Sequence, residues 1–407
     1  MKSFSSYLVE SKNTHMEHIE DMVFNDGVTG ARLAINSLRQ LRDMLAGNAS
    51  QAYDMTVKWD GAPAIFAGID PRDGEFFIAK KGIFNKDPQV FKTRADIDRE
   101  LSGDLAEKFR IALDEFRKLG ISKGVFQGDL MFTRSDVSVD RIDGNSYITF
   151  QPNTIVYAVP EESKLAKQIK AAKIGVVWHT TYTGNSFENM TASFGQAIVT
   201  KMNKVRTVWM DDATYQDQSG KATFTKRETA AVTKHLSDAG KTFRRLPSAF
   251  INAISEDEEK RMRIKTFLNK YVRAGKPFPN PRKMSKDLYD YVQEYYGKQS
   301  EKYKTEKGKS GVRAKQDKLL QVLGAPNELT SLFEFFNSIV QAKLMVINKL
   351  HQAQGLGTFL KTRNGFKVTD REGYVAIDKM TGGAVKLVDR LEFSKANFSD
   401  DVLKGWQ

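Results

Sequence analysis

Four short segments of the chain place charged residues beside glycine or within apolar runs. In the first, residues 57–63 read Val-Lys-Trp-Asp-Gly-Ala-Pro, so that Lys58 and Asp60 lie where a strand-like run meets the turn at Gly61. Glycine lets the backbone approach a phosphate closely. A lysine whose pKa is depressed by its neighbours can attack phosphorus and form a phosphoramidate. Taken alone, the segment also fits a surface Lys–Asp pair at a turn.

The other three segments supply two carboxylates and a second lysine. Residues 124–130 (Gly-Val-Phe-Gln-Gly-Asp-Leu) set Asp129 among apolar residues, where it can hold a ribose hydroxyl or a metal ion or end a strand in a turn. Glu372 precedes a glycine at a strand start and can bind Mg²⁺. Lys386 is the one inward-capable polar residue of the alternating run at 384–388. A buried lysine there needs an anion, which a triphosphate supplies, whereas an edge lysine would reach solvent.

In this order, the motifs Lys-x-Asp-Gly, Gly-Asp, Glu-Gly-x-Val and a strand lysine resemble those of the covalent nucleotidyltransferase superfamily. That superfamily comprises ATP- or NAD-dependent polynucleotide ligases and mRNA-capping guanylyltransferases. The resemblance covers about residues 50–190 and 365–398. It implies an α+β fold with a ligase-type adenylation domain, in which two facing antiparallel sheets hold the nucleotide. It also implies ATP and Mg²⁺ as cofactors.

The resemblance gives each motif residue an expected role. Lys58 is the nucleophile that takes AMP, Asp129 faces the ribose, Glu372 is the metal carboxylate, and Lys386 contacts the α-phosphate. The remaining expected site residues are Asp60 (catalytic), Gly61 (nucleotide), Asp129 again as a metal ligand, Lys80 or Lys81 in place of an arginine-bearing motif, and Phe150 or Tyr157 as the adenine-stacking ring.

Three positions depart from the superfamily pattern. Asp129 lies where the family usually has glutamate, and Pro63 where DNA ligases carry an arginine. The last strand reads Lys386-Leu-Val instead of Lys-x-Lys. The missing second lysine favours a degenerate, non-enzymatic member, whereas retention of the other motifs favours an enzyme.

Composition narrows the chemistry further. The chain has no cysteine, which excludes disulfides, thiolate zinc sites and cysteine nucleophiles. Its five histidines have no spacing typical of a metal site. No run of 18 apolar residues occurs, so we expect no membrane partner.

The positive charge is concentrated in one part of the chain. Residues 191–370 hold 33 Lys and Arg against 18 Asp and Glu, whereas the remainder holds 30 against 32. Such an excess attracts polyanions, although a solvated helical face would also carry it. Aromatic residues interleaved with the charge between 267 and 303 favour nucleic acid, because rings can stack on unpaired bases.

Hydrophobic periodicity predicts the elements that position these residues. We expect helices at 29–46 and 104–118, and strands at 55–59, 64–67, 76–80, 124–132, 147–150, 154–159, 175–181, 366–369, 373–378 and 384–389. Residues 190–355 read as long amphipathic helices, including a broad apolar stripe from Leu329 to Leu350. The predicted domains are a nucleotidyltransferase domain (13–189 and 365–407) and a basic helical nucleic-acid-binding insert (190–364). Only 21 residues follow Lys386, so we expect no C-terminal OB-fold, as in RNA-ligase-like members.

The first 12 residues carry a separate signal. They resemble the capsid-targeting peptides of internal head proteins in large tailed phages, which a prohead protease cuts after Leu-x-Glu, here Leu8-Val9-Glu10. An amphipathic helical turn packed on the body is the alternative. The chain as a whole also resembles proteins of large tailed phages. The resemblance implies a phage protease and capsid as partners, and a location in the virion interior, the host bacterial cytoplasm, or both.

The function predicted from the sequence is an ATP-dependent polynucleotide ligase. It would form lysyl-AMP on Lys58 and seal 5′-phosphate to 3′-hydroxyl ends, with RNA as the expected substrate. The alternatives are a DNA ligase, an adenylyltransferase with another acceptor, and a degenerate nucleotidyltransferase serving as a nucleic-acid-binding virion protein. The sequence does not distinguish an RNA substrate from a DNA substrate, or ATP from NAD or GTP as the nucleotide.

Overall fold

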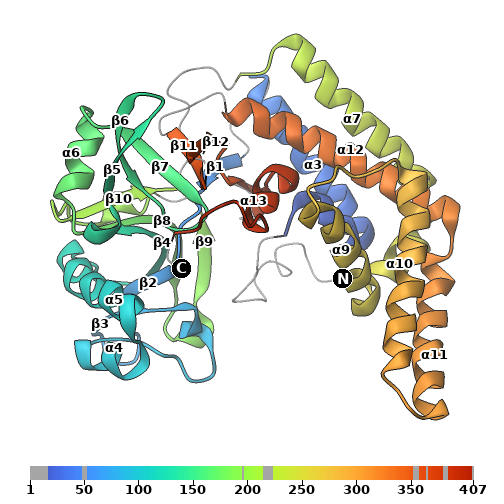
Figure 1. Ribbon diagram of the computed structural model, residues 1–407, viewed down its shortest axis with the longest axis horizontal. Coiled ribbons are helices and arrows are strands. Elements are labelled where there is room, and N and C mark those ends of the chain that lie inside the picture. Colours follow the sequence, from blue (N-terminus) through green and yellow to red (C-terminus); the bar gives the residue numbers. More distant parts are fainter. Residues whose placement is uncertain are drawn as a thin grey trace.

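The computed structural model describes residues 17–47, 53–194, 197–213, 223–351, 357–363, 365–378 and 384–405. The predicted targeting peptide and its cleavage after Glu10 lie outside the described residues. Figure 1 shows the strands gathered on one side of the molecule and the long helices on the other. The predicted α+β class with antiparallel sheets is confirmed.

A three-stranded antiparallel sheet joins the two ends of the chain. Its order is β1 (Tyr53–Lys58), β13 (Gly373–Asp378) and β14 (Ala384–Leu387). In this sheet Lys58 pairs with Gly373, and Val375 pairs with Lys386. The predicted strands at 55–59, 373–378 and 384–389 are therefore confirmed, and they are neighbours.

A six-stranded sheet lies next to it. Its main path is β10 (Val208–Asp212), β8 (Ile174–Thr183), β4 (Val125–Thr133), β2 (Ala64–Ile69) and β3 (Phe76–Ala79), with β9 (Thr191–Phe194) added to β8. Pairing is antiparallel except between β8 and β10. Helices α4 (Arg94–Glu100) and α5 (Gly103–Phe116) contribute Ile97, Phe109 and Phe116 to an apolar core that includes Trp178 of β8.

The third sheet is a five-stranded antiparallel meander. Its order is β12 (Gly365–Val368), β11 (Gly357–Thr362), β7 (Ile155–Pro160), β6 (Asn145–Phe150) and β5 (Ser138–Ile142). Helix α6 (Lys164–Ala171) packs against β6 and β7. The short remaining elements are η2 (Lys81–Phe84), η3 (Arg117–Leu119), η4 (Arg134–Asp136), η5 (Phe187–Asn189), η6 (Val199–Lys201), η7 (Arg390–Ser394) and α13 (Lys395–Asn397).

The helices form what we call the helical lobe. It comprises α7 (Lys226–Arg245), α8 (Ser248–Ser255), α9 (Glu258–Arg273), α10 (Pro281–Glu301), α11 (Glu306–Leu323) and α12 (Pro326–His351), together with the N-terminal η1 (Ile19–Asp21), α2 (Met22–Asn25) and α3 (Gly27–Leu45). The apolar stripe of α12 is buried as predicted. Residues 226–351 hold 26 Lys and Arg against 14 Asp and Glu, which is nearly the whole net charge of the chain.

The predicted domain boundaries need correction at three places. Strands β9 and β10 belong to the sheet of β8, so the helical segment starts at residue 226 and not at 190. Strand β11 belongs to the meander, so the sheets resume at 357. Helix α3 packs on α7, α8 and α12, so this part of the chain belongs to the helical lobe, whereas His18 before it forms a β-bridge with Lys386 of β14. Among the described residues, no helix has the length and apolarity needed to cross a bilayer.

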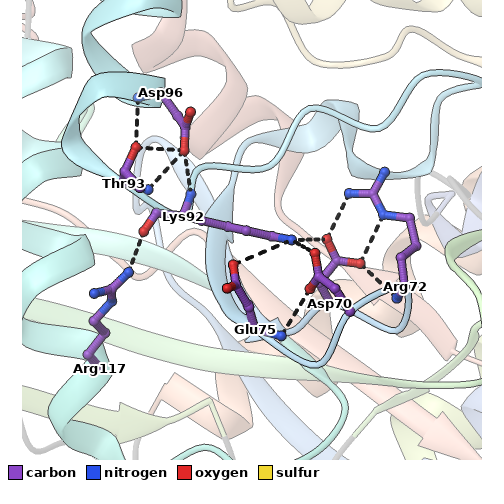
Figure 2. A network of polar contacts seen from close by, with 8 residues as sticks. Asp70, Arg72, Glu75, Lys92, Thr93, Asp96 and Arg117 are labelled. Carbon is purple, nitrogen blue, oxygen red and sulfur yellow. Dashed lines mark hydrogen bonds and ion pairs between the residues drawn. The ribbon is translucent and has the colours of Figure 1, made fainter.

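The β2–β3 hairpin is held by a polar network, shown in Figure 2. The fully buried Asp70 accepts hydrogen bonds from Arg72 Nε at 2.9 Å and Nη2 at 2.7 Å, and its carboxylate lies 2.9 Å from Lys92 Nζ. Although burial alone would raise the pKa of Asp70, these bonds hold it at about 2. Arg117 at the end of α5 donates to the carbonyl oxygen of Lys92. The network ties the hairpin to the helices that cover its sheet.

Candidate active site

The small sheet brings together three of the predicted site residues. Lys58 is the last residue of β1, Glu372 immediately precedes β13, and Lys386 lies in β14. The Nζ atom of Lys58 forms an ion pair with Oε1 of Glu372. Glycine is required after Glu372, because Gly373 has φ +155° and a Cβ atom there would lie 2.3 Å from the carbonyl oxygen of Leu387. The Glu-Gly motif is therefore explained by the close approach of β13 and β14.

The charges of this cluster are shifted by burial and by one another. Burial is the main cause that raises the pKa of Glu372 to about 7, against the opposing effect of Lys58. For Lys58, burial would lower the pKa, but Glu372, Asp129 and Asp60 outweigh it and raise it. The pKa of Lys386 is lowered by burial and by the charge of Lys58. The cluster thus holds two ammonium groups against one carboxylate that burial makes reluctant to ionise.

Asp129 lies beside residues 59–63, the loop that follows β1. A Cβ atom on Gly61 would lie 2.4 Å from Cβ of Asp129 and 3.2 Å from the carbonyl oxygen of Leu130. The N–H of Ala62 donates to that same carbonyl oxygen at 3.1 Å. Gly61 is therefore needed for the loop after β1 to pass directly over β4.

His179, which was not among the predicted site residues, lies beside Asp129. On β8, its Nε2 atom lies 3.7 Å from Oδ2 of Asp129, and its Nδ1 atom lies 2.7 Å from Oγ1 of Thr180. Both the imidazole and the carboxylate of Asp129 are about one quarter exposed. The available signal was a histidine that directly follows the apolar run 174–178 of β8, where the strand changes from apolar to polar residues.

Asp60 was predicted to be catalytic, and the structure gives it a different position. It is 4% exposed and accepts hydrogen bonds from Asn153 Nδ2 at 2.8 Å and from the backbone N–H groups of Thr154 and Ile155, both at 2.7 Å. Its own N–H donates to the hydroxyl oxygen of Tyr157 at 2.7 Å. Burial raises the pKa of Asp60, with these bonds opposing the shift. Asp60 therefore fastens the loop that follows β1 to β7, and its carboxylate is occupied by these donors.

The structure does not support an adenine-stacking role for Phe150 or Tyr157. They are 1% and 3% exposed, and they stack on each other with ring centroids 5.5 Å apart. Tyr157 also packs against Trp59 at 5.1 Å. Because both rings are enclosed by other side chains, neither offers a face to a nucleotide.

Lys80 and Lys81 lie at the end of β3 and the start of η2. In the six-stranded sheet, Ala79 of β3 pairs with Phe66 of β2, and Ala64 of β2 pairs with Asp129 of β4. The two lysines therefore lie at the same end of these strands as Asp129. Lys81 is exposed and Lys80 is half-buried. Within the described part of the chain, neither forms an ion pair with Glu372 or with any other carboxylate.

No group of three His, Cys, Asp or Glu side chains able to hold a metal ion occurs among the described residues. The two predicted metal ligands, Glu372 and Asp129, are single carboxylates of different sheets. A Mg²⁺ ion here would therefore take most of its ligands from nucleotide phosphates and water, as Mg²⁺ commonly does in nucleotide sites.

A buried charged cluster behind Lys386 was also missed by the sequence reasoning. Lys343 of α12 contacts Glu20 at 2.6 Å and donates to the carbonyl oxygen of Val388 at 2.8 Å. Arg390 contacts Asp21 at 3.1 Å and donates to Oδ1 of Asn269 at 2.6 Å. These contacts link the end of β14 to helices α9 and α12 of the helical lobe.

Helix α9 lies in the basic segment predicted to bind nucleic acid, but several of its basic side chains are engaged within the protein. Arg263 is buried against Tyr295 and lies 3.0 Å from Glu259. Arg261 donates to the carbonyl oxygen of Ser255, Lys265 pairs with Glu17 at 2.8 Å, and Lys270 lies over the ring of Tyr291. Arg261, Arg263 and Lys265 are thus engaged within the protein, whereas Lys270 is exposed beside Tyr291.

Comparison with known proteins places the chain in a family. A family model described as a family of unknown function, DUF6267, matches residues 13–401, and the chain belongs to that family. No curated protein and no solved structure matches the chain.

Proposed function

We propose that this member of the DUF6267 family is an ATP-dependent polynucleotide ligase of the covalent nucleotidyltransferase type, with Lys58 as its nucleophile. The observation that carries the proposal is the meeting of Lys58, Glu372 and Lys386 in one small sheet. These residues come from opposite ends of the chain. A Lys–Asp turn and a Glu–Gly turn that were only surface loops would not need to lie together, whereas a nucleotidyl-transfer site requires these side chains to be close to one another.

The first step would be attack of Lys58 Nζ on the α-phosphorus of ATP. An N–P bond forms, the bond from the α-phosphorus to the bridging oxygen of pyrophosphate breaks, and Nζ releases its proton. The Lys58 side chain is 28% exposed, so a nucleotide can reach it. Burial and the charge of Lys58 lower the pKa of Lys386, and the α-phosphate would stabilise its ammonium form.

Lys58 must leave its ion pair before it can react, because the carboxylate of Glu372 favours the ammonium form. Bound Mg²⁺ would neutralise phosphate charge and accept the Glu372 carboxylate as a ligand. Glu372 is suited to hold the ion, because burial raises its pKa to about 7 and a bound cation would stabilise the charged carboxylate. Lys386 would then repel the Lys58 ammonium and favour its deprotonation. Asp129, beside Gly61, would orient the ribose.

In the following steps AMP would pass from Lys58 to a 5′-phosphate. A phosphate oxygen forms a bond to the phosphorus of AMP as the N–P bond breaks, and a 3′-hydroxyl then displaces AMP. Positioning and charge neutralisation carry most of such phosphoryl transfers. We propose RNA ends as the acceptor.

The test is incubation with α-³²P-labelled ATP, GTP and NAD in the presence of Mg²⁺, followed by denaturing electrophoresis. We expect a covalent label from ATP that is lost in Lys58→Ala and Lys58→Arg, since arginine keeps the charge but is effectively never deprotonated. Lys367→Arg, at an exposed position of β12, is the matched control and should label normally. A wild-type chain that stays unlabelled with every nucleotide would refute the proposal. Labelled enzyme is then offered RNA ends and nicked DNA to identify the acceptor.

A second candidate is a degenerate nucleotidyltransferase that binds nucleic acid inside a phage particle. It is favoured by Val388, which is buried where the superfamily has its second lysine. In that case oligonucleotides bind but no label forms. The phage location is tested by mass spectrometry of purified particles, where processing after Glu10 predicts a chain beginning at Ser11. An intact Met1 on protein from particles would contradict the processing, and absence of the protein from particles would contradict the phage location.

A further inference from the structure

A groove of about 550 Å³ opens on the helical lobe, beside the turn between α11 and α12. The polar and aromatic side chains that matter for its chemistry are Arg245 of α7, Arg282, Lys286 and Tyr289 of α10, and Asn327 and Thr330 of α12. A second groove of about 390 Å³ continues from it along α7 and shares Arg245 and Glu334. The two grooves adjoin along α7, α10 and α12 of the helical lobe, and neither is lined by a residue of the candidate active site (Figure 1 shows these helices).

The first groove has an excess of positive charge. Its single carboxylate, Glu334, lies 3.2 Å from Arg245. Within the described ranges, Arg282 and Lys286 form no ion pair, whereas the adjacent Lys283 pairs with Asp287 outside the groove. Two cations one helical turn apart therefore face the groove without a counter-charge, which favours an anionic ligand.

The beginning of α12 also lines the groove, through Pro326, Asn327 and Thr330. The hydroxyls of Ser285, which is 4% exposed, and of Thr330 both donate to the carbonyl oxygen of Pro326, at 3.4 and 2.6 Å, so they are used within the protein. The N-terminus of this 26-residue helix, which carries a partial positive charge, therefore lies beside the same space as the two cations.

We infer that this groove binds the phosphate backbone of a single-stranded polynucleotide, an inference that rests on the proposed function for the class of ligand. The Arg282 guanidinium can hold two phosphate oxygens at once. Tyr289 is 41% exposed beside it, and its ring can stack on an unpaired base. The tip of the α10–α11 hairpin, residues 298–318, holds eight Lys and Arg against three Asp and Glu, and so extends the positive surface along α10. An acidic peptide would satisfy the cations but would leave the exposed ring unexplained.

The experiment measures fluorescence anisotropy of labelled 20-nucleotide RNA and DNA strands with the full chain across a range of NaCl concentrations. Arg282→Ala combined with Lys286→Ala should weaken binding on the order of tenfold near 0.1 M salt, and should reduce the slope of log K against log salt by roughly 1.4, for two phosphates at about 0.7 each. The matched control is Lys164→Ala combined with Lys167→Ala on α6, which removes the same charge from an exposed helix of the other part of the molecule. It should bind within twofold of the wild type.

Equal weakening in both double variants would overturn the inference, because only net charge would then matter. Absence of binding by the wild type even at low salt would overturn it too, and would leave the groove to an acidic protein partner. Covalent labelling of Lys58 is measured in the same preparations. In the wild type, absent labelling with retained binding refutes only the proposed function, and absent binding with retained labelling refutes only this inference.

Discussion

Replacement of Asp60 separates a catalytic role from a positioning one. In Asp60→Ala the buried N–H groups of Thr154 and Ile155 lose their acceptor, as does the amide of Asn153. Leaving a buried donor unpaired costs about 1–3 kcal/mol. The substitution also removes a carboxylate whose charged form is disfavoured by burial, as its raised pKa indicates, and this offsets part of the loss in stability. We therefore expect a net loss of about 3 kcal/mol in the free energy of unfolding.

The expected change in melting temperature follows from the size of the chain. An unfolding entropy of about 2.1 cal/mol/K per residue over 407 residues gives about 0.85 kcal/mol/K. A loss of about 3 kcal/mol then lowers Tm by about 3–4 °C. Asp60→Asn keeps an oxygen acceptor for the two backbone groups, so it should lower Tm by only about 1 °C.

The assay combines calorimetry with covalent labelling by ATP. If Asp60 only positions the loop, Asp60→Asn should still form lysyl-AMP within about threefold of the wild type at saturating ATP, whereas Lys58→Ala should form none. An Asp60→Asn protein with unchanged Tm and no label would refute the reasoning, because the carboxylate would then act in the chemistry itself.

Three further predictions follow from the same contacts. Glu372→Gln should lower the pKa of Lys58, because the carboxylate favours the ammonium form. Competitive acetylation followed by mass spectrometry across a range of pH measures this pKa, and an unchanged titration midpoint would contradict the ion pair. Asp70, with a pKa of about 2 against 3.8 when unfolded, contributes about 2 kcal/mol above pH 4, and this is lost as pH falls toward 2. The difference in Tm between wild type and Asp70→Asn should therefore narrow by about half from pH 6 to pH 3, and a constant difference would argue against the network. Gly61→Ala should displace the loop that follows β1 (residues 59–63) and abolish labelling, because the added Cβ atom would lie 2.4 Å from Cβ of Asp129. Normal labelling of this variant would show that the loop has room for a side chain.

The local elements were predictable from the sequence because their signals are local. The strands that carry Lys58, Asp129 and Lys386 follow from short apolar runs bounded by glycine. The order of motifs then predicted that Lys58 and Glu372 share a site, and the structure places them in an ion pair. Whether ATP binds there stays a prediction.

The remaining features depend on which surfaces meet, and periodicity does not encode that. The pattern of α3 shows that one face is buried, but not that the face packs on α7 and α12. In the same way, an aromatic residue near a site can line it or lie beneath it, and Phe150 and Tyr157 lie beneath it. Asp60 has the sequence context of a catalytic residue, and only the arrangement of β7 shows which donors its carboxylate meets.

The pairing of β1 with β13 has a consequence for the order of folding. Lys58 pairs with Gly373, and every residue of the helical lobe except the N-terminal segment lies between them in sequence. Closing so long a loop costs entropy before the pairing contributes any stability. During synthesis the helices α7–α12 emerge and can pack on α3 while β1 still lacks its partner. Lys58 thus gains its partner Glu372 only after the basic helices exist, so a truncated chain would carry the cationic surface without the Lys58–Glu372 ion pair. Pulse-labelled hydrogen exchange during refolding should accordingly show the β1 amides protected after those of α12, and the opposite order would contradict this sequence of events.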